Sequence, residues 1–176
     1  MPFTPFHLGP GLGIGVPLRK YIHTTTFILA NILVDIESFI VLILRLNYPL
    51  HGYLHTFLFA FFLGLLLGGI MFMLEKIFKP FFTFFFLESP KKDLNLKAFL
   101  LAGISGTLLH VLLDSPLYTE IYPLFPLKIN PLYNPSLSIE IYGFCILMGL
   151  FGILYYSVLL VYSFYKKFKN EKDNIT

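Results

Sequence analysis

Four long apolar runs are the feature that most limits what this chain can fold into. They lie at about 21–46, 53–78, 97–115 and 137–165. A helix needs ~20 mainly apolar residues to cross the hydrocarbon core of a bilayer, and each run approaches or exceeds that length. Only 13% of the 176 residues are charged, compared with about 25% in an ordinary globular domain. The sequence therefore predicts an all-α integral membrane protein, a bundle of about four transmembrane helices within one domain.

Lysine and arginine residues beside the apolar runs predict how the chain is oriented. With four spans, most of them fall on one side of the membrane, namely Arg19, Lys20, Lys76, Lys79, Lys91, Lys92, Lys97, Lys166, Lys167 and Lys169. The other side carries Arg45 and Lys128. Because cytoplasmic loops are enriched in basic residues, we expect a multi-pass cell-membrane protein with both termini in the cytoplasm and a basic tail at 166–176. The expected partner is the lipid bilayer, and no nucleic acid is expected.

The N-terminal segment, residues 1–18, is rich in proline and glycine and has His7 as its one ionisable side chain. It predicts either a short half-inserted helix or an extended cover, because irregular backbone at membrane depth must pack on protein or line a polar cavity. The Gly-x-Gly-x-Gly pattern at 11–15 follows no predicted strand and does not qualify as a phosphate-binding loop. The single cysteine, Cys145, excludes an internal disulfide.

Ionisable side chains gather near the non-cytoplasmic ends of the predicted spans. Each of two pairs, His51 with His55 and His110 with Asp114, is spaced four residues apart, which places both members on one face if the segment is helical. Carboxylates within the first span are costly in a membrane and by default mark a function or a buried partner; these are Asp35 and Glu37. Histidines and carboxylates converging from three helices predict a divalent-metal site, for zinc first and for manganese or iron as alternatives.

Asp35 and Glu37 raise a geometric question. On an ideal helix they point about 200° apart, so both can face one metal only if the helix ends or loosens near Ile36. Otherwise Glu37 faces elsewhere. The HGYLH motif at 51–55 has zincin spacing but lacks the glutamate that serves as base in zincins. A hydrolytic site would therefore take its catalytic base from Glu37 or Glu120.

The order of these motifs resembles a known membrane family. MPFTPFH at the start, LVDIES, HGYLHT and HVLLDSP occur in the order seen in the LexA-binding, inner-membrane-associated hydrolases, also called membrane-bound metal-dependent hydrolases. That family is distantly similar to zinc-dependent phospholipase C. The second resemblance implies five metal ligands, which are His7, Asp35, His55, His110 and Asp114. It also implies a further ligand position at Glu120, where the soluble enzymes have histidine.

The resulting expectation is a metal-dependent hydrolase in the membrane. By analogy the bond is a phosphoester, and the substrate reached at an interface would be a lipid headgroup or a lipid-linked phosphate. The alternative is a metal-ion or proton transporter that uses the same residues. A haem protein fits less well, because each histidine motif is accompanied by a carboxylate. A scaffold without chemistry fits less well, because buried acids are costly.

Overall fold

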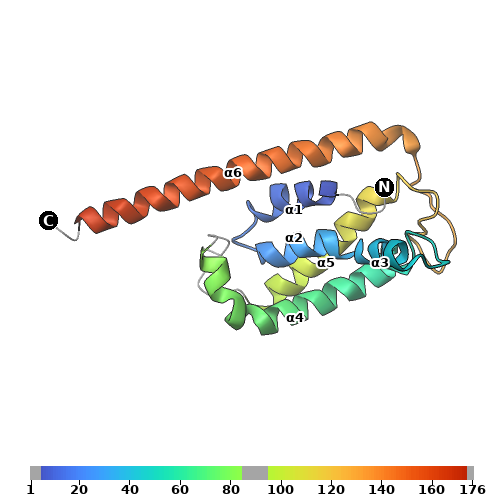
Figure 1. The fold of residues 1–176 in the computed structure, drawn as a ribbon, viewed down its shortest axis with the longest axis horizontal. Helices are drawn as coiled ribbons and strands as arrows, with labels where there is room; N and C mark the ends of the chain where they lie inside the picture. The colour runs from blue at the N-terminus through green and yellow to red at the C-terminus, as the bar shows by residue number, and fades with distance from the viewer. Residues whose placement is uncertain (1–4, 85–94, 174–176) are drawn as a thin grey trace.

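The computed structural model describes residues 5–84 and 95–173, and this part of the chain is entirely helical outside its loops. Its helices are α1 (Leu8–Gly15), α2 (Thr24–Leu33), α3 (Ile36–Leu44), α4 (Phe57–Phe84), α5 (Leu96–Asp114) and α6 (Ser138–Asp173), with single 3-10 turns η1 (Pro5–His7), η2 (Tyr53–His55) and η3 (Pro135–Leu137). Figure 1 shows α6 along one side, α4 along the other, and α1, α2 and α5 between them.

Four segments are long and apolar enough to cross a membrane, as the sequence predicts. They are Thr24–Leu44, Phe57–Glu75, Leu96–Asp114 and Pro135–Lys166. The last helix continues to Asp173, so residues expected as a tail extend α6, which runs well beyond the other helices (Figure 1). Most of the four segments' side chains face outward, where lipid can cover them.

The glycine-rich N-terminal segment is a short helix held between two others. On one face of α1, Gly9 and Gly13 approach the α6 backbone; a methyl group at Gly13 would lie 2.5 Å from the carbonyl oxygen of Met148. On the opposite face, Gly11 and Gly15 contact α2. The alternating glycines therefore let three helices come close together, and this packing brings His7 to the same end of the bundle as the other predicted ligands.

Glycines also set the distance between α4 and α5, which are the most extensively paired helices. A Cβ at Gly64 would lie 2.6 Å from the Gly103 carbonyl oxygen, and one at Gly68 would lie 2.7 Å from the Phe99 carbonyl oxygen. Small residues allow this close approach between membrane helices. The neighbouring Gly69 has no such contact, because nothing lies within 4 Å of its Cβ position.

The first apolar run is broken in the middle. Residues 34–35 form a turn that separates α2 from α3, which points in a different direction (Figure 1). The loosening near Ile36 that would let Asp35 and Glu37 serve one site is therefore present. Beyond the break, the exposed side of α3 is apolar and includes Phe39, Ile40 and Ile43.

A buried histidine starts α2 at the end opposite the break. The His23 side chain accepts a hydrogen bond from the backbone N–H of Thr26, and its ring stacks on Phe99 at 4.2 Å. Burial lowers the pKa of His23 to about 4. The folded protein therefore keeps His23 neutral at pH values where the unfolded chain protonates it.

We expect the titration of His23 to lower the free energy of unfolding by about 2–3 kcal/mol between pH 7 and pH 4.5. The unfolded state binds a proton below about pH 6.5 and the folded state does not, so acid favours unfolding until the folded-state pKa is passed. The measurement is the melting temperature in detergent for wild type and His23→Asn, because asparagine caps helices well and does not titrate. Equal losses of stability in the two proteins would show that His23 is not responsible.

Candidate metal centre

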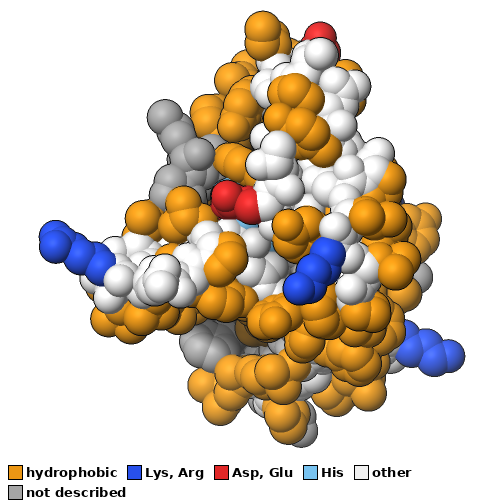
Figure 2. Space-filling model, turned by 90° about the vertical axis from the view of Figure 1, so that its right-hand side faces the viewer, with side chains coloured by type: hydrophobic (Ala, Val, Ile, Leu, Met, Phe, Trp, Pro, Cys, Tyr) orange, Lys and Arg blue, Asp and Glu red, His pale blue; other side chains and the backbone are white. Residues whose placement is uncertain are grey.

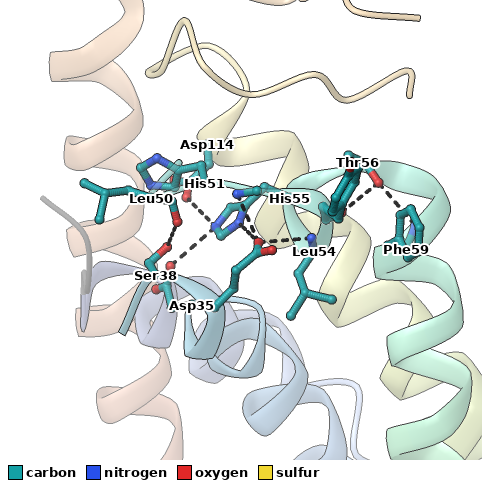
Figure 3. Close-up of polar contacts among 12 residues, drawn as sticks. Asp35, Ser38, Leu50, His51, Leu54, His55, Thr56, Phe59 and Asp114 are labelled. Atoms are coloured by element: carbon teal, nitrogen blue, oxygen red, sulfur yellow. Dashed lines mark hydrogen bonds and ion pairs between the residues drawn. The ribbon is translucent and has the colours of Figure 1, made fainter. Parts of the chain in front are cut away.

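Four predicted ligands meet at one end of the bundle. Asp35 lies in the turn between α2 and α3, His55 ends η2, and His110 and Asp114 lie one turn apart on α5. One nitrogen or oxygen from each lies within 4.8 Å of the others, and all four side chains are buried. Figure 3 shows the His55 ring directed toward Asp35 and Asp114. The spacing and the residue types suit a bound metal ion.

The free nitrogens of the two histidines decide how this cluster is interpreted. Nε2 of His55 lies 3.6 Å from Asp35 Oδ1 and 3.9 Å from Asp114 Oδ2. Nε2 of His110 lies 3.4 Å from each of the same two oxygens. Both nitrogens are buried and lack a hydrogen-bond partner. Buried polar atoms are almost always satisfied, and a cation between these two nitrogens and the two carboxylates would satisfy them.

A nearby pair shows what a direct hydrogen bond looks like here. His7 Nε2 lies 2.8 Å from Asp114 Oδ1, within the normal range for N–H···O. The separations of 3.4–3.9 Å in the cluster are longer. They are close to the ~3.3 Å between donors placed tetrahedrally ~2.0–2.1 Å from zinc. The donor set therefore fits a metal better than direct histidine–carboxylate ion pairs.

The break after α2 fixes the orientation of His110. A helix leaves its last carbonyls without helical donors, and the Asn31 carbonyl oxygen accepts a 2.7 Å hydrogen bond from His110 Nδ1. Because a carbonyl only accepts, Nδ1 carries the proton and Nε2 presents its lone pair to Asp35 and Asp114. The Asn31 side chain itself donates to the Phe27 carbonyl oxygen at 2.9 Å. No sequence motif signals a backbone carbonyl.

Glu37 fixes the orientation of His55. Its Oε2 lies 3.3 Å from His55 Nδ1 and accepts hydrogen bonds from the backbone N–H groups of Gly52 and Leu54, both at 3.0 Å. The Tyr48 hydroxyl donates to Oε1 at 3.2 Å. The carboxylate therefore holds the His55 ring with Nε2 facing the cluster. Glu37 lies on the side of His55 away from the other ligands.

We expect Glu37→Gln to weaken metal binding by about 10–100-fold, the usual effect of losing a group that orients a ligand histidine. The amide keeps the size of the side chain but removes the charge that holds Nδ1–H. Metal affinity would be measured by competition with a chelator. Glu140→Gln is the control, because Glu140 is an exposed acid in the first turn of α6. Unchanged affinity in Glu37→Gln would exclude this positioning role.

Two predicted ligands lie beside the group of four. His7 binds the far oxygen of Asp114, its ring lies 4.0 Å from that of His110, and its buried Nδ1 has no hydrogen-bond partner. His51 Nδ1 lies 2.5 Å from Glu120 Oε1, and its ring contacts His55 at 4.7 Å. The expectation that His51 and His55 share a helix face is wrong. His51 lies in a bend and His55 in η2, both before α4 begins. The 51–56 turn, rather than helical spacing, brings their rings together.

His51 and Glu120 lie between the cluster and the exterior. His51 is buried and stacks on Tyr118, whereas the Glu120 side chain is 44% exposed. Burial and the neighbouring His55 lower the pKa of His51, which favours a neutral ring that donates Nδ1–H to Glu120. At this end of the molecule the surface is mainly hydrophobic and only a trace of histidine is visible, beside an acidic side chain (Figure 2). The cluster is therefore well shielded from solvent.

Comparison with known proteins does not add to this geometry. Scans against protein-family models, the curated proteins and the solved structures found no match for the chain. The donor set is consequently the basis for assigning a function.

Proposed function

We propose that the protein is a membrane-bound, metal-dependent hydrolase of phosphoester bonds. The observation that carries the proposal is the pair of buried, unpartnered Nε2 atoms on His55 and His110, both facing Asp35 and Asp114. Zinc is the proposed metal because it accepts imidazole and carboxylate ligands in a tetrahedral arrangement. When bound it would supply Lewis acidity to a substrate oxygen and to water.

The chain's own residues have distinct parts in this proposal. Asp35, His55, His110 and Asp114 would hold the ion, while Glu37 and the Asn31 carbonyl orient the two histidines. His7 keeps one oxygen of Asp114 occupied, and the other oxygen lies 3.4 Å from His110 Nε2, where it could serve as a ligand.

Proton transfer falls to Glu120 rather than Glu37. Both oxygens of Glu37 already accept hydrogen bonds, whereas Glu120 is half-exposed and its carboxylate contacts His51. A general base must reach the proton it removes, and Glu120 lies on the open side of the site. We assign it that role, with His51 positioning its carboxylate.

A transporter is less well supported by the same geometry. A carrier needs polar groups that continue across the bundle. Throughout residues 5–84 and 95–173, the group of four is the one cluster of His, Cys, Asp or Glu with metal-ligand spacing. It lies at one end of the helices rather than midway. The hydrolase is therefore our proposal. The basic residues favour a cytoplasmic C-terminus, whereas the described chain starts at the metal-site end, where His7 contacts Asp114, so the two termini lie at opposite ends of the bundle (Figure 1).

Chelation tests the proposal directly. Metal bound at 100 times its dissociation constant contributes about 2.7 kcal/mol, so we expect EDTA to lower the melting temperature by about 5–10 °C. Zinc should restore it, and the purified protein should contain stoichiometric metal by mass spectrometry. Hydrolysis of bis(p-nitrophenyl) phosphate should be lost and restored in parallel. A protein that contains no metal, and whose melting does not change with zinc, would refute the metal centre; a metal-loaded protein without hydrolysis would refute the reaction.

A further inference from the structure

A cavity of about 310 Å³ opens beside the candidate metal centre. Four aromatic side chains line it, namely Tyr48, Tyr53, Tyr122 and Phe125. Its volume is at the lower end of the ~300–1,000 Å³ typical of ligand sites, enough for a polar headgroup and too small for a whole diacyl lipid. The cavity reaches the metal centre at His51, which lines the cavity and contacts His55.

The cavity lies at the level where the membrane-crossing segments begin and end. Thr56, part of its lining, immediately precedes the segment Phe57–Glu75, and Glu120, also in the lining, follows the end of Leu96–Asp114 by six residues. The loop that covers the cavity also exposes large apolar side chains, including Leu124, Leu127 and Ile129. Contiguous exposed apolar surface of this kind marks a membrane or binding surface, and tyrosine is enriched where bilayer and water meet. The mouth of the cavity therefore lies at the depth of lipid headgroups.

The charges that line the cavity favour an anion. Its one acid, Glu120, is held by His51 at 2.5 Å. Its one base, Lys128, is exposed and makes no ion pair with any residue of the described chain. An unpaired ammonium group beside a buried histidine leaves a cationic position for a phosphate, and lysine commonly binds phosphate as a point charge.

We propose that this cavity binds the headgroup of an anionic phospholipid, with Lys128 on the phosphate and the aromatic side chains around the glycerol region, while the acyl chains remain in the bilayer. The inference rests on the proposed hydrolase and names its substrate class. A lipid enters from the membrane plane, and the metal centre lies behind His51 at the inner end of the cavity.

The test is lipid retention measured by native mass spectrometry on the full chain in detergent, with zinc present. The probes are dioleoyl phosphatidylglycerol, dioleoyl phosphatidylcholine and dioleoylglycerol, which share acyl chains and differ in charge. We expect phosphatidylglycerol to be retained about tenfold more than either of the others, the size of one charge-assisted hydrogen bond. We expect Lys128→Gln to remove this preference and Lys97→Gln, an exposed lysine at the opposite end, to keep it. Soluble glycerophosphoglycerol should not displace the lipid.

Three results would overturn the lipid inference. They are equal retention of the three lipids, an unchanged preference in Lys128→Gln, and displacement by the soluble headgroup, which would indicate a water-soluble phosphate ligand. Metal content and hydrolysis of bis(p-nitrophenyl) phosphate are measured on the same samples. A wild type that holds metal and cleaves the soluble diester but shows no lipid preference refutes this inference alone. A wild type without metal or hydrolysis refutes the proposed function instead.

Discussion

His110→Ala is expected to abolish stoichiometric metal binding and to lower hydrolysis of bis(p-nitrophenyl) phosphate by about 10³-fold or more. The reason is that His110 Nε2 lies 3.4 Å from both carboxylates of the cluster, closer than His55 Nε2 at 3.6 and 3.9 Å. A lost Lewis acid costs several kcal/mol of transition-state stabilisation, and each ~1.4 kcal/mol is tenfold in rate. The measurements are metal content by mass spectrometry and the rate at saturating zinc.

Two further variants make this result interpretable. His110→Gln keeps much of the side-chain volume, so a loss of metal in both variants cannot be attributed to a cavity. Leu112→Ala changes an exposed residue on the same turn of α5 and should keep both metal and activity. Retention of stoichiometric metal by His110→Ala and His110→Gln would contradict the ligand assignment. Each protein must first elute as a single species in size-exclusion chromatography.

Gly103→Val is expected to destabilise the protein by about 3 kcal/mol or more. A side chain at Gly103 would overlap the backbone of Gly64 on α4. The reciprocal contact, from a Cβ at Gly64 to the Gly103 carbonyl, would be 2.6 Å, well under the ~3.3–3.6 Å of a close C–H···O contact. Because the obstacle is backbone, relief requires α4 and α5 to separate, and overpacking a tight interface typically costs 1–3 kcal/mol even where side chains can adjust. The melting temperature in detergent and the yield of monodisperse protein measure this effect.

Gly69→Val is the matched control for this packing prediction. It makes the same substitution on α4, at a glycine whose Cβ would have no atom within 4 Å, so its melting temperature should remain close to that of wild type. Separation of α4 and α5 would also move His55, which precedes α4, away from His110 on α5. Gly103→Val should therefore bind metal weakly even where some folded protein survives. Equal melting temperatures for the two variants would show that the close approach of the helices is unimportant.

The apolar runs determine the fold class because their length and composition leave few alternatives in water. Segments of this kind can satisfy their backbone groups as helices in lipid, and the four observed segments lie close to the predicted ranges. The (i, i+4) spacing of His110 and Asp114 likewise follows from sequence, since both lie within one uninterrupted helix. The sequence did not decide whether the glycine-rich N-terminal segment forms a helix or an extended cover. A helix of such residues forms only when its neighbours, here α2 and α6, pack closely on both faces.

The sequence alone determined the membrane helices and the four residues that can hold a metal, because hydrophobic length and carboxylate depth are local properties. Tertiary structure decided how those residues are used. The break at residues 34–35 frees the Asn31 carbonyl for His110, and the turn at 51–55 places His55 between Glu37 and the cluster. The same turn leaves His51 outside the group of four, in contact with His55, and pairs it with Glu120. These assignments depend on contacts between segments far apart in the chain, which no local spacing can specify.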